Sequence, residues 1–154
     1  MSSMRALVVY GAPYENTRVV AGHVADGLRA THEVTVVPGA GATADLLTEA
    51  DLLVVGGPTH IRGLSSGVHE LVKVPQSGPV LAAAFDTRIH GGPAVPGRSS
   101  RSIARLLMRH GYLTIVSPES FAVTAQGTPL DGEDTRACRW GAALGIISTF
   151  AHAA

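Results

Sequence analysis

A polar loop near the start of the chain combines residue types that bind anions. Residues 11–17, Gly-Ala-Pro-Tyr-Glu-Asn-Thr, follow the short apolar run 5–10 and precede residues with helical spacing. Asn16 or Thr17 can cap the helix that follows, so free backbone N–H groups and the positive end of the helix dipole collect where the apolar run ends. This arrangement favours an anionic ligand such as a phosphate.

Polar residues also follow the apolar runs 51–57 and 79–85. The first run is followed by Pro-Thr-His-Ile-Arg-Gly at 58–63, and the second by Asp-Thr-Arg at 86–88. In an open parallel sheet, ligands bind beyond the carboxyl ends of the strands, at the point where the strand order reverses. We therefore expect loops 11–17 and 58–63 to face one common ligand.

The elements that must position these loops alternate along the chain. Val-rich runs too short for a buried helix, and ended by Gly or Pro, indicate buried parallel strands. Helical spacing between them indicates crossover helices, so the sequence predicts an α/β fold with a doubly wound, five-stranded parallel sheet, order 2-1-3-4-5, in a three-layer sandwich. The predicted strands are 5–10, 34–37, 51–57, 79–85 and a fifth strand made of 112–116 and 121–123, which is interrupted near Pro118. The predicted helices are about 18–29, 43–49, 65–74, 99–110 and 131–151. Thr43 is expected to cap the second of these helices, either Ser99 or Ser100 to cap the fourth, and Gly111 to end the fourth.

Size and composition restrict the functional classes. A chain of 154 residues with 45% hydrophobic content fits one domain, residues 1–154, with a packed core. Its formal net charge of zero argues against a dedicated nucleic-acid binder. Cys138 is the single cysteine and cannot form an internal disulfide. No run suits a signal peptide or a bilayer span, so we expect a soluble, cytoplasmic protein without a membrane partner. The sequence leaves its oligomeric state open.

Four segments, in order along nearly the whole chain, resemble the flavodoxin family, especially its short bacterial members. They are Asn16-Thr-Arg18, the stretch from Asp51 to His60, Phe85-Asp-Thr-Arg88 and Pro118-Glu-Ser-Phe121. The resemblance implies a flavodoxin-like fold that binds FMN. By position, the phosphate would lie against Ala12, Pro13, Tyr14, Glu15, Asn16 and Thr17. The isoalloxazine ring would be bordered by Pro58, Thr59, His60, Ile61, Gly63, Asp86, Thr87 and Arg88.

The resemblance implies an electron carrier that exchanges electrons with a reductase and an acceptor protein, and not an enzyme in its own right. Two alternatives remain. One is an FMN-dependent reductase that uses NAD(P)H to reduce quinones or similar acceptors. The other is a flavodoxin-like domain that has lost FMN. Ala12 supplies no hydroxyl where the family usually has one, and a Glu15 carboxylate 4 Å from a phosphate would cost about 4 kcal/mol per unit charge pair.

Two further segments mimic known catalytic motifs. Residues 92–99 resemble a nucleotide-binding loop, but their two prolines remove N–H donors that such a loop needs. Residues 63–67, Gly-Leu-Ser-Ser-Gly, match the nucleophile elbow of serine hydrolases, although Ser65 is better interpreted as a helix cap. This remote alternative would need a triad drawn from Ser65, His152 and one of Asp86, Asp131 or Asp134.

Other polar residues have plain interpretations. The histidines show no metal-ligand spacing, among themselves or with Cys138, so we expect no metal site. Trp140 lies in the last predicted helix and is interpreted as a packing residue. Four arginines recur at helical spacing and could face a phosphate backbone or an acidic partner, but zero net charge favours a solvated helix face. They are Arg98, Arg101, Arg105 and Arg109.

Overall fold

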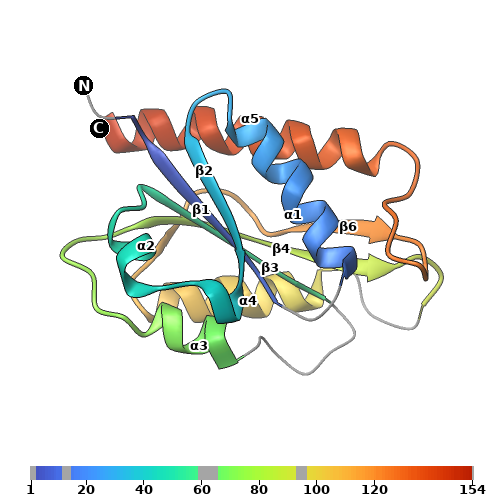
Figure 1. Cartoon of the computed structure of the whole chain (residues 1–154), viewed down its shortest axis with the longest axis horizontal. Helices are drawn as coiled ribbons and strands as arrows, with labels where there is room; N and C mark the ends of the chain where they lie inside the picture. The colour runs from blue at the N-terminus through green and yellow to red at the C-terminus, as the bar shows by residue number, and fades with distance from the viewer. Residues whose placement is uncertain (1–2, 12–14, 59–65, 93–96, 154) are drawn as a thin grey trace.

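A parallel sheet lies between two layers of helices in the computed structural model, which describes residues 3–11, 15–58, 66–92 and 97–153 (Figure 1). The strands are β1 (Arg5–Tyr10), β2 (Glu33–Pro38), β3 (Leu52–Pro58), β4 (Leu81–Ile89), β5 (Leu113–Thr114) and β6 (Glu119–Val123). The helices are α1 (Glu15–Leu28), the short 3-10 helix η1 (Gly39–Gly41), α2 (Ala44–Thr48), α3 (Ser66–Val72), α4 (Arg98–Arg109) and α5 (Glu133–Ala153).

The sheet order β2-β1-β3-β4-β5 confirms the predicted order, and all the pairings between these strands are parallel. The fifth position is shared, because β5 pairs with the start of β4 and β6 pairs with its end. The predicted interruption near Pro118 falls between these two short strands. Parallel strands place their carboxyl ends at one edge of the sheet, where ligands of such folds bind.

Alternate residues of each central strand feed two separate cores. In β1, Ala6 and Val8 pack on the side of α1 and α5, whereas Leu7 and Val9 pack on the side of α2, α3 and α4. Because both faces are covered, the strand sequence is continuously apolar instead of alternating with polar residues. This two-sided burial explains why short Val-rich runs predicted the central strands well.

Strand β4 is longer than the sequence indicated. We predicted that Asp86, Thr87 and Arg88 lie in a loop after the strand, but β4 continues through them to Ile89. They pair in register with Ser120, Phe121 and Ala122 of β6. The pairing partner is more than 30 residues away in the chain, and it supplies the ladder that keeps this polar segment extended.

Two helix starts also differ from the prediction. Helix α1 begins at Glu15, so Asn16 and Thr17 lie inside its first turn and do not cap it. Helix α4 is preceded by Gly97, whose positive φ of 77° suits glycine, and neither Ser99 nor Ser100 caps it. The predicted cap of α2 is confirmed, since the Thr43 hydroxyl accepts a hydrogen bond from the Leu46 amide.

Helices α1 and α5 lie side by side on one face of the sheet, and glycines allow their backbones to touch (Figure 1). A Cβ added to Gly27 would lie 1.9 Å from the Cys138 carbonyl oxygen, and one added to Gly141 would lie 2.0 Å from the Val24 carbonyl oxygen. These glycines therefore fix how closely the two helices approach.

Candidate functional site

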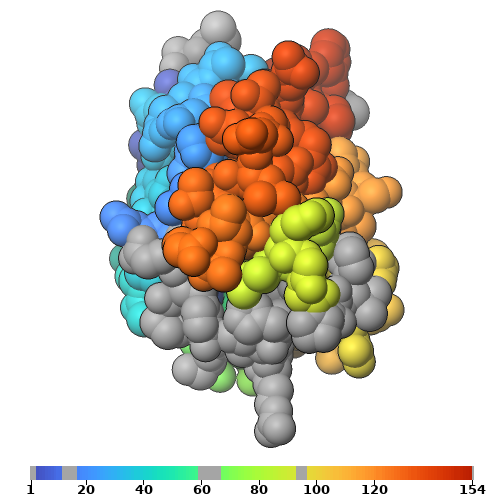
Figure 2. Space-filling model, turned by 90° about the vertical axis from the view of Figure 1, so that its right-hand side faces the viewer, coloured from blue at the N-terminus to red at the C-terminus, as the bar shows by residue number. Residues whose placement is uncertain are grey.

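The carboxyl end of the sheet gathers the first turn of α1, the ends of β3 and β4 and the start of α5 (Figure 1). Figure 2 views the molecule from this end, where blue α1, the yellow-green end of β4 and orange α5 lie next to one another. Thr17 in α1 and Thr87 in β4 are both fully buried here, and their hydroxyl oxygens lie 2.9 Å apart. Pro58, the last residue of β3, pairs in register with Thr87. The start of α1 thus meets the two central strand ends, and a helix start is a place where backbone N–H groups can bind an anion.

Asp86 places a carboxylate inside this end of the molecule. Its side chain is fully buried, accepts a 2.6 Å hydrogen bond from the Ser120 hydroxyl, and accepts a 2.8 Å hydrogen bond from the Ser100 amide at the start of α4. Burial raises the pKa of Asp86 above its usual range, and the hydrogen bonds from the two serines partly oppose this shift. Asp86 thereby connects β4, β6 and α4.

Arg88, near the end of β4, has a buried Nε atom for which no hydrogen-bond partner is found among the described residues. A buried N–H without an acceptor costs about 1–3 kcal/mol, more for a charged group. Its positive charge also helps to lower the pKa values of Asp86 and Glu133. An unused cationic donor at this place fits an anionic group better than a neutral one.

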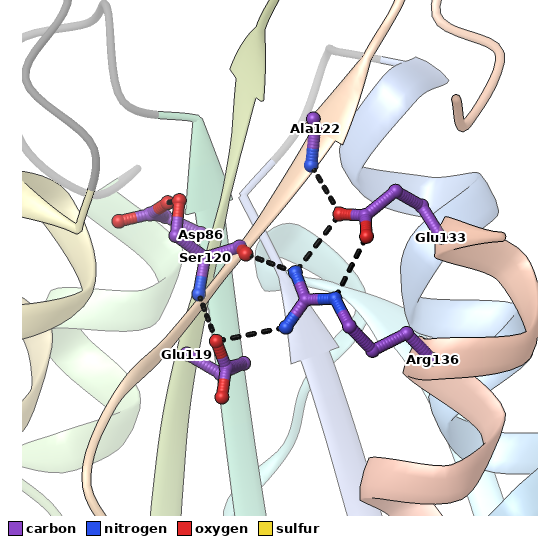
Figure 3. A network of polar contacts seen from close by, with 6 residues as sticks. All are labelled: Asp86, Glu119, Ser120, Ala122, Glu133 and Arg136. Atoms are coloured by element: carbon purple, nitrogen blue, oxygen red, sulfur yellow. Dashed lines mark hydrogen bonds and ion pairs between the residues drawn. The ribbon is translucent and has the colours of Figure 1, made fainter. Parts of the chain in front are cut away.

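Arg136 organises a polar network between α5 and β6 (Figure 3). Its guanidinium donates to both carboxylate oxygens of Glu133, at 2.7 and 2.9 Å, to Glu119 at 2.9 Å, and to the Ser120 carbonyl. The guanidinium carbon also lies 4.4 Å from the centre of the Phe121 ring, within range for a cation–π contact. The bond from Arg136 is the largest cause that lowers the pKa of Glu133.

The same network covers the outer edge of β6. The Ser120 amide donates to Glu119, and the Ala122 amide donates to the Glu133 carboxylate at 2.7 Å. The Ser120 carbonyl accepts from Arg136, and the Ala122 carbonyl accepts from the Leu130 amide. An edge strand with free backbone groups can pair with another chain. Here those groups already have partners, so the network closes this edge of the sheet.

An aromatic cluster lies behind the polar residues. Phe85, Phe121 and Trp140 contact one another edge to face, with ring centres 5.8–6.0 Å apart. This confirms the interpretation of Trp140 as a packing residue. Phe85 also covers Gly56 of β3, where an added Cβ would lie 2.0 Å from the ring. The strand ends that carry Asp86 and Ser120 are thus held by a rigid apolar base.

The predicted site residues fall into three groups. Thr17, Pro58, Asp86, Thr87 and Arg88 are brought together at the carboxyl end of the sheet. Glu15 and Asn16 lie in the first turn of α1. The part that the residues of both groups play in binding stays a prediction. The third group lies outside the described part of the chain and consists of Ala12, Pro13, Tyr14, Thr59, His60, Ile61 and Gly63.

Sequence reasoning missed the residues that position this end of the fold. Ser100, Ser120, Glu133 and Arg136 all make contacts that support Asp86 or β6. The i, i+3 spacing of Glu133 and Arg136 was the available signal, because it allows an ion pair on one helix face. Their partners in β6 are separated by 11 or more residues and leave no local pattern.

The serine hydrolase alternative is not supported by the arrangement. Ser65 lies outside the described residues, and His152 lies near the end of α5, where its ring is 3.9 Å from Asp51. Asp86 instead binds Ser100 and Ser120 at the carboxyl end of the sheet. Asp134 begins the same long helix that ends near His152, about 27 Å away at 1.5 Å per residue. The structure therefore does not bring His152 together with Asp86 or Asp134.

Together, the strand order and the helices on both faces of the sheet define a doubly wound α/β protein. No family model matches the sequence, and no curated protein matches it either. Solved structures do match. A flavodoxin from the domain Archaea shares 21% identity at a TM-score of 0.75, covering 95% of this chain and 99% of that chain. Oxidised Flavodoxin 2 from Bacillus cereus shares 18% identity at a TM-score of 0.73, covering 96% of this chain and 99% of that chain.

A flavodiiron core from Synechocystis sp. PCC6803 is similar over part of its own length. It shares 15% identity at a TM-score of 0.77, with 97% of this chain but 37% of that chain covered. At these identities the likeness shows the fold, and the chain has a flavodoxin-like fold, as the sequence resemblance implied. None of the helices in the described part of the chain combines the length and apolar content that a membrane crossing needs.

Proposed function

We propose that the chain binds FMN without a covalent link and carries electrons between a reductase and an acceptor protein. The buried hydroxyl pair of Thr17 and Thr87 carries the proposal. It lies where α1 begins and β4 ends, and a helix start offers N–H donors that suit a phosphate. The flavodoxin-like fold supports FMN as the compound that brings the phosphate to this place.

Four of the predicted site residues have a part in this proposal. Thr17 and the amides of the first turn of α1 would bind the phosphate. Arg88 would direct its unused Nε donor at an electron-rich atom of the ligand, and Thr87 and Asp86 would border the ring. FMN supplies one- and two-electron transfer when it is bound, so the protein needs no nucleophile of its own. The protein positions the ligand and keeps water from it.

The test is a fluorescence titration of the purified protein with FMN, together with the flavin absorbance of the protein as isolated. Thr17→Val keeps the side-chain shape but removes the hydroxyl, so we expect affinity to fall by about 10- to 100-fold, the loss of one charge-assisted hydrogen bond. Thr149→Val is the matched control, because Thr149 is exposed on α5 and its hydroxyl donates a local hydrogen bond to the Gly145 carbonyl of the same helix.

A double variant separates binding from folding. Thr17→Val also deprives the Thr87 hydroxyl of a buried partner, which costs stability. Thr17→Val/Thr87→Val removes both hydroxyls together and should also bind FMN weakly. Urea unfolding of both variants shows whether the protein that binds weakly is still folded. Protein that is colourless and takes up no FMN would refute the proposal in favour of a domain without cofactor. Yellow protein that oxidises NAD(P)H unaided would favour the reductase.

A further inference from the structure

The exposed face of α4 carries a line of four arginines. Arg98, Arg101, Arg105 and Arg109 are all exposed, and their spacing places them within about one third of the helix circumference over about 16 Å of its length. We call these four residues the α4 basic face. The opposite side of α4, with Ile103 and Leu107, is buried against the sheet, so the arginines point away from the core.

The α4 basic face is electrostatically unfavourable in the isolated chain. Arg98 and Arg101 lie in the first turn, which contains no acidic residue, although a helix start favours negative charge. Like charges three or four positions apart also repel one another, by about 0.2–0.5 kcal/mol per pair. None of the ion pairs between described residues includes any of these four arginines.

The acidic residues that balance the total charge lie elsewhere. Glu33 and Glu49 pair with Arg5 at the start of β1, and the Arg5 amide donates to Asp51. Glu119 and Glu133 pair with Arg136. Among the described residues, these carboxylates thus have other partners and form no ion pair with the α4 basic face, although the formal net charge of the chain is zero.

An open groove runs beside this face, between α4 and the edge of the sheet. It has a volume of about 620 Å³ and is lined on one side by Arg101, Arg105 and Met108. The segment that joins β5 to β6 forms the other side with Ile115, Val116 and Pro118. Met108 is 52% exposed. Arginine, methionine and apolar side chains together are typical of protein interfaces.

We propose that the α4 basic face and this groove bind the acidic surface of a partner protein. Carboxylates of the partner would relieve the repulsion between the arginines, and apolar residues beside them would cover Met108 and Ile115. A nucleic acid fits less well, because nucleic-acid binders usually carry a positive total charge, whereas the formal net charge of this chain is zero. The arginines and the apolar side chains that line the groove supply the contacts, so we expect the partner to bind through side chains.

The place of this surface suggests what kind of protein the partner is. Helix α4 starts at the carboxyl end of the sheet, where the Ser100 amide bonds to Asp86. A protein bound along α4 would therefore reach the end of the molecule at which we placed FMN. That the partner is an acidic electron carrier rests on the proposed function, whereas the binding surface itself follows from charge and exposure alone.

The test measures binding to a plant-type [2Fe–2S] ferredoxin, a small acidic electron carrier, with cytochrome c as a basic probe of similar size. In NMR titrations of the 15N-labelled protein at about 20 mM salt, ferredoxin should shift α4 and residues 114–118, and cytochrome c should not. Raising the salt to about 200 mM should weaken binding, because exposed charges are then screened. Arg101→Gln/Arg105→Gln should lower the affinity by about tenfold.

A control variant removes the same charge elsewhere. Arg29 is exposed in the turn that follows α1, and Arg139 is exposed on α5. The variant Arg29→Gln/Arg139→Gln therefore matches the change in net charge and should leave the affinity within about twofold. Three results would overturn the proposal: no binding of ferredoxin at low salt, an equal loss in the control variant, or tighter binding of a single-stranded DNA 12-mer than of ferredoxin. Binding is scored with or without flavin, so this outcome and the FMN titration are independent.

Discussion

Gly27→Ala tests whether the contact of the α1 and α5 backbones limits the stability of the fold. The added methyl group would lie 1.9 Å from the Cys138 carbonyl oxygen and 2.6 Å from the Ala142 nitrogen, whereas ordinary contacts begin at 3.4 Å. Both neighbours are backbone atoms and cannot turn aside. The helices must therefore separate by about 1.5 Å, and a gap of 0.5–1 Å already removes a quarter to a half of a contact's dispersion energy.

We expect a large loss of stability from this separation. Overpacking typically costs about 1–3 kcal/mol and sometimes more, and here the separation also loosens Val24 and Leu28 from Leu144. We expect the free energy of unfolding to fall by about 3 kcal/mol. The melting temperature should fall by about 6–12 °C, at about 2–4 °C per kcal/mol for a chain of this size. Urea unfolding followed by circular dichroism measures the change.

Gly22→Ala is the matched control within the same helix. An added Cβ at Gly22 has no atom within 4 Å, so alanine should stabilise the helix by about 0.5–1 kcal/mol through its better helix propensity. The reasoning is refuted if Gly27→Ala costs less than about 1 kcal/mol at an unchanged m-value. It is equally refuted if both variants lose the same stability, because the loss would then not depend on the backbone contact.

Three further predictions concern buried or partly buried polar groups. Glu133→Gln should lower the free energy of unfolding, measured in urea, by about 2 kcal/mol, because Arg136 loses its charged partner. Asp134→Asn in the same turn is the control and should stay within about 0.5 kcal/mol of the parent protein. Equal losses in the two variants would contradict the role of the network. Tyr112→Phe should leave the free energy of unfolding unchanged or raise it by about 1 kcal/mol, because no partner for the buried Tyr112 hydroxyl is found among the described residues. A clear loss of stability in urea unfolding would contradict this prediction, because it would show that the hydroxyl has a partner. Burial lowers the pKa of His32 below 6.5, so the unfolded chain binds the His32 proton more tightly than the folded chain does. The contribution of His32 to stability should therefore be fully present above pH 6.5 and be lost as the pH falls below that value. An NMR titration of His32 with a midpoint at or above pH 6.5 would contradict this prediction.

The order of elements could be predicted from the sequence because the central strands are buried on both faces. Their apolar runs are unbroken, and the helices between them show regular spacing. Local chemistry also predicted single features correctly, such as the Thr43 cap of α2 and the break near Pro118. These signals act over a few residues, which is why they can be read without a structure.

Features that depend on distant partners could not be predicted. Asp86 continues a strand because β6 pairs with it, and nothing near Asp86 in the sequence indicates that pairing. Two serines suggested a cap for α4, but Gly97 adopts the left-handed conformation that precedes the helix and the Ser100 amide bonds to Asp86. The Arg136 network likewise joins residues 16 or 17 positions apart.

The arginines of α4, which form no ion pair with another described residue, also affect how the whole molecule behaves in an electric field. Equal numbers of acidic and basic side chains give a formal charge of zero, yet the α4 basic face and the carboxylates around Arg5 occupy separate regions of the surface. Such a molecule has a permanent dipole moment despite being neutral overall. It can be retained on a cation-exchange resin near its isoelectric point, because the resin contacts one face and not the average charge.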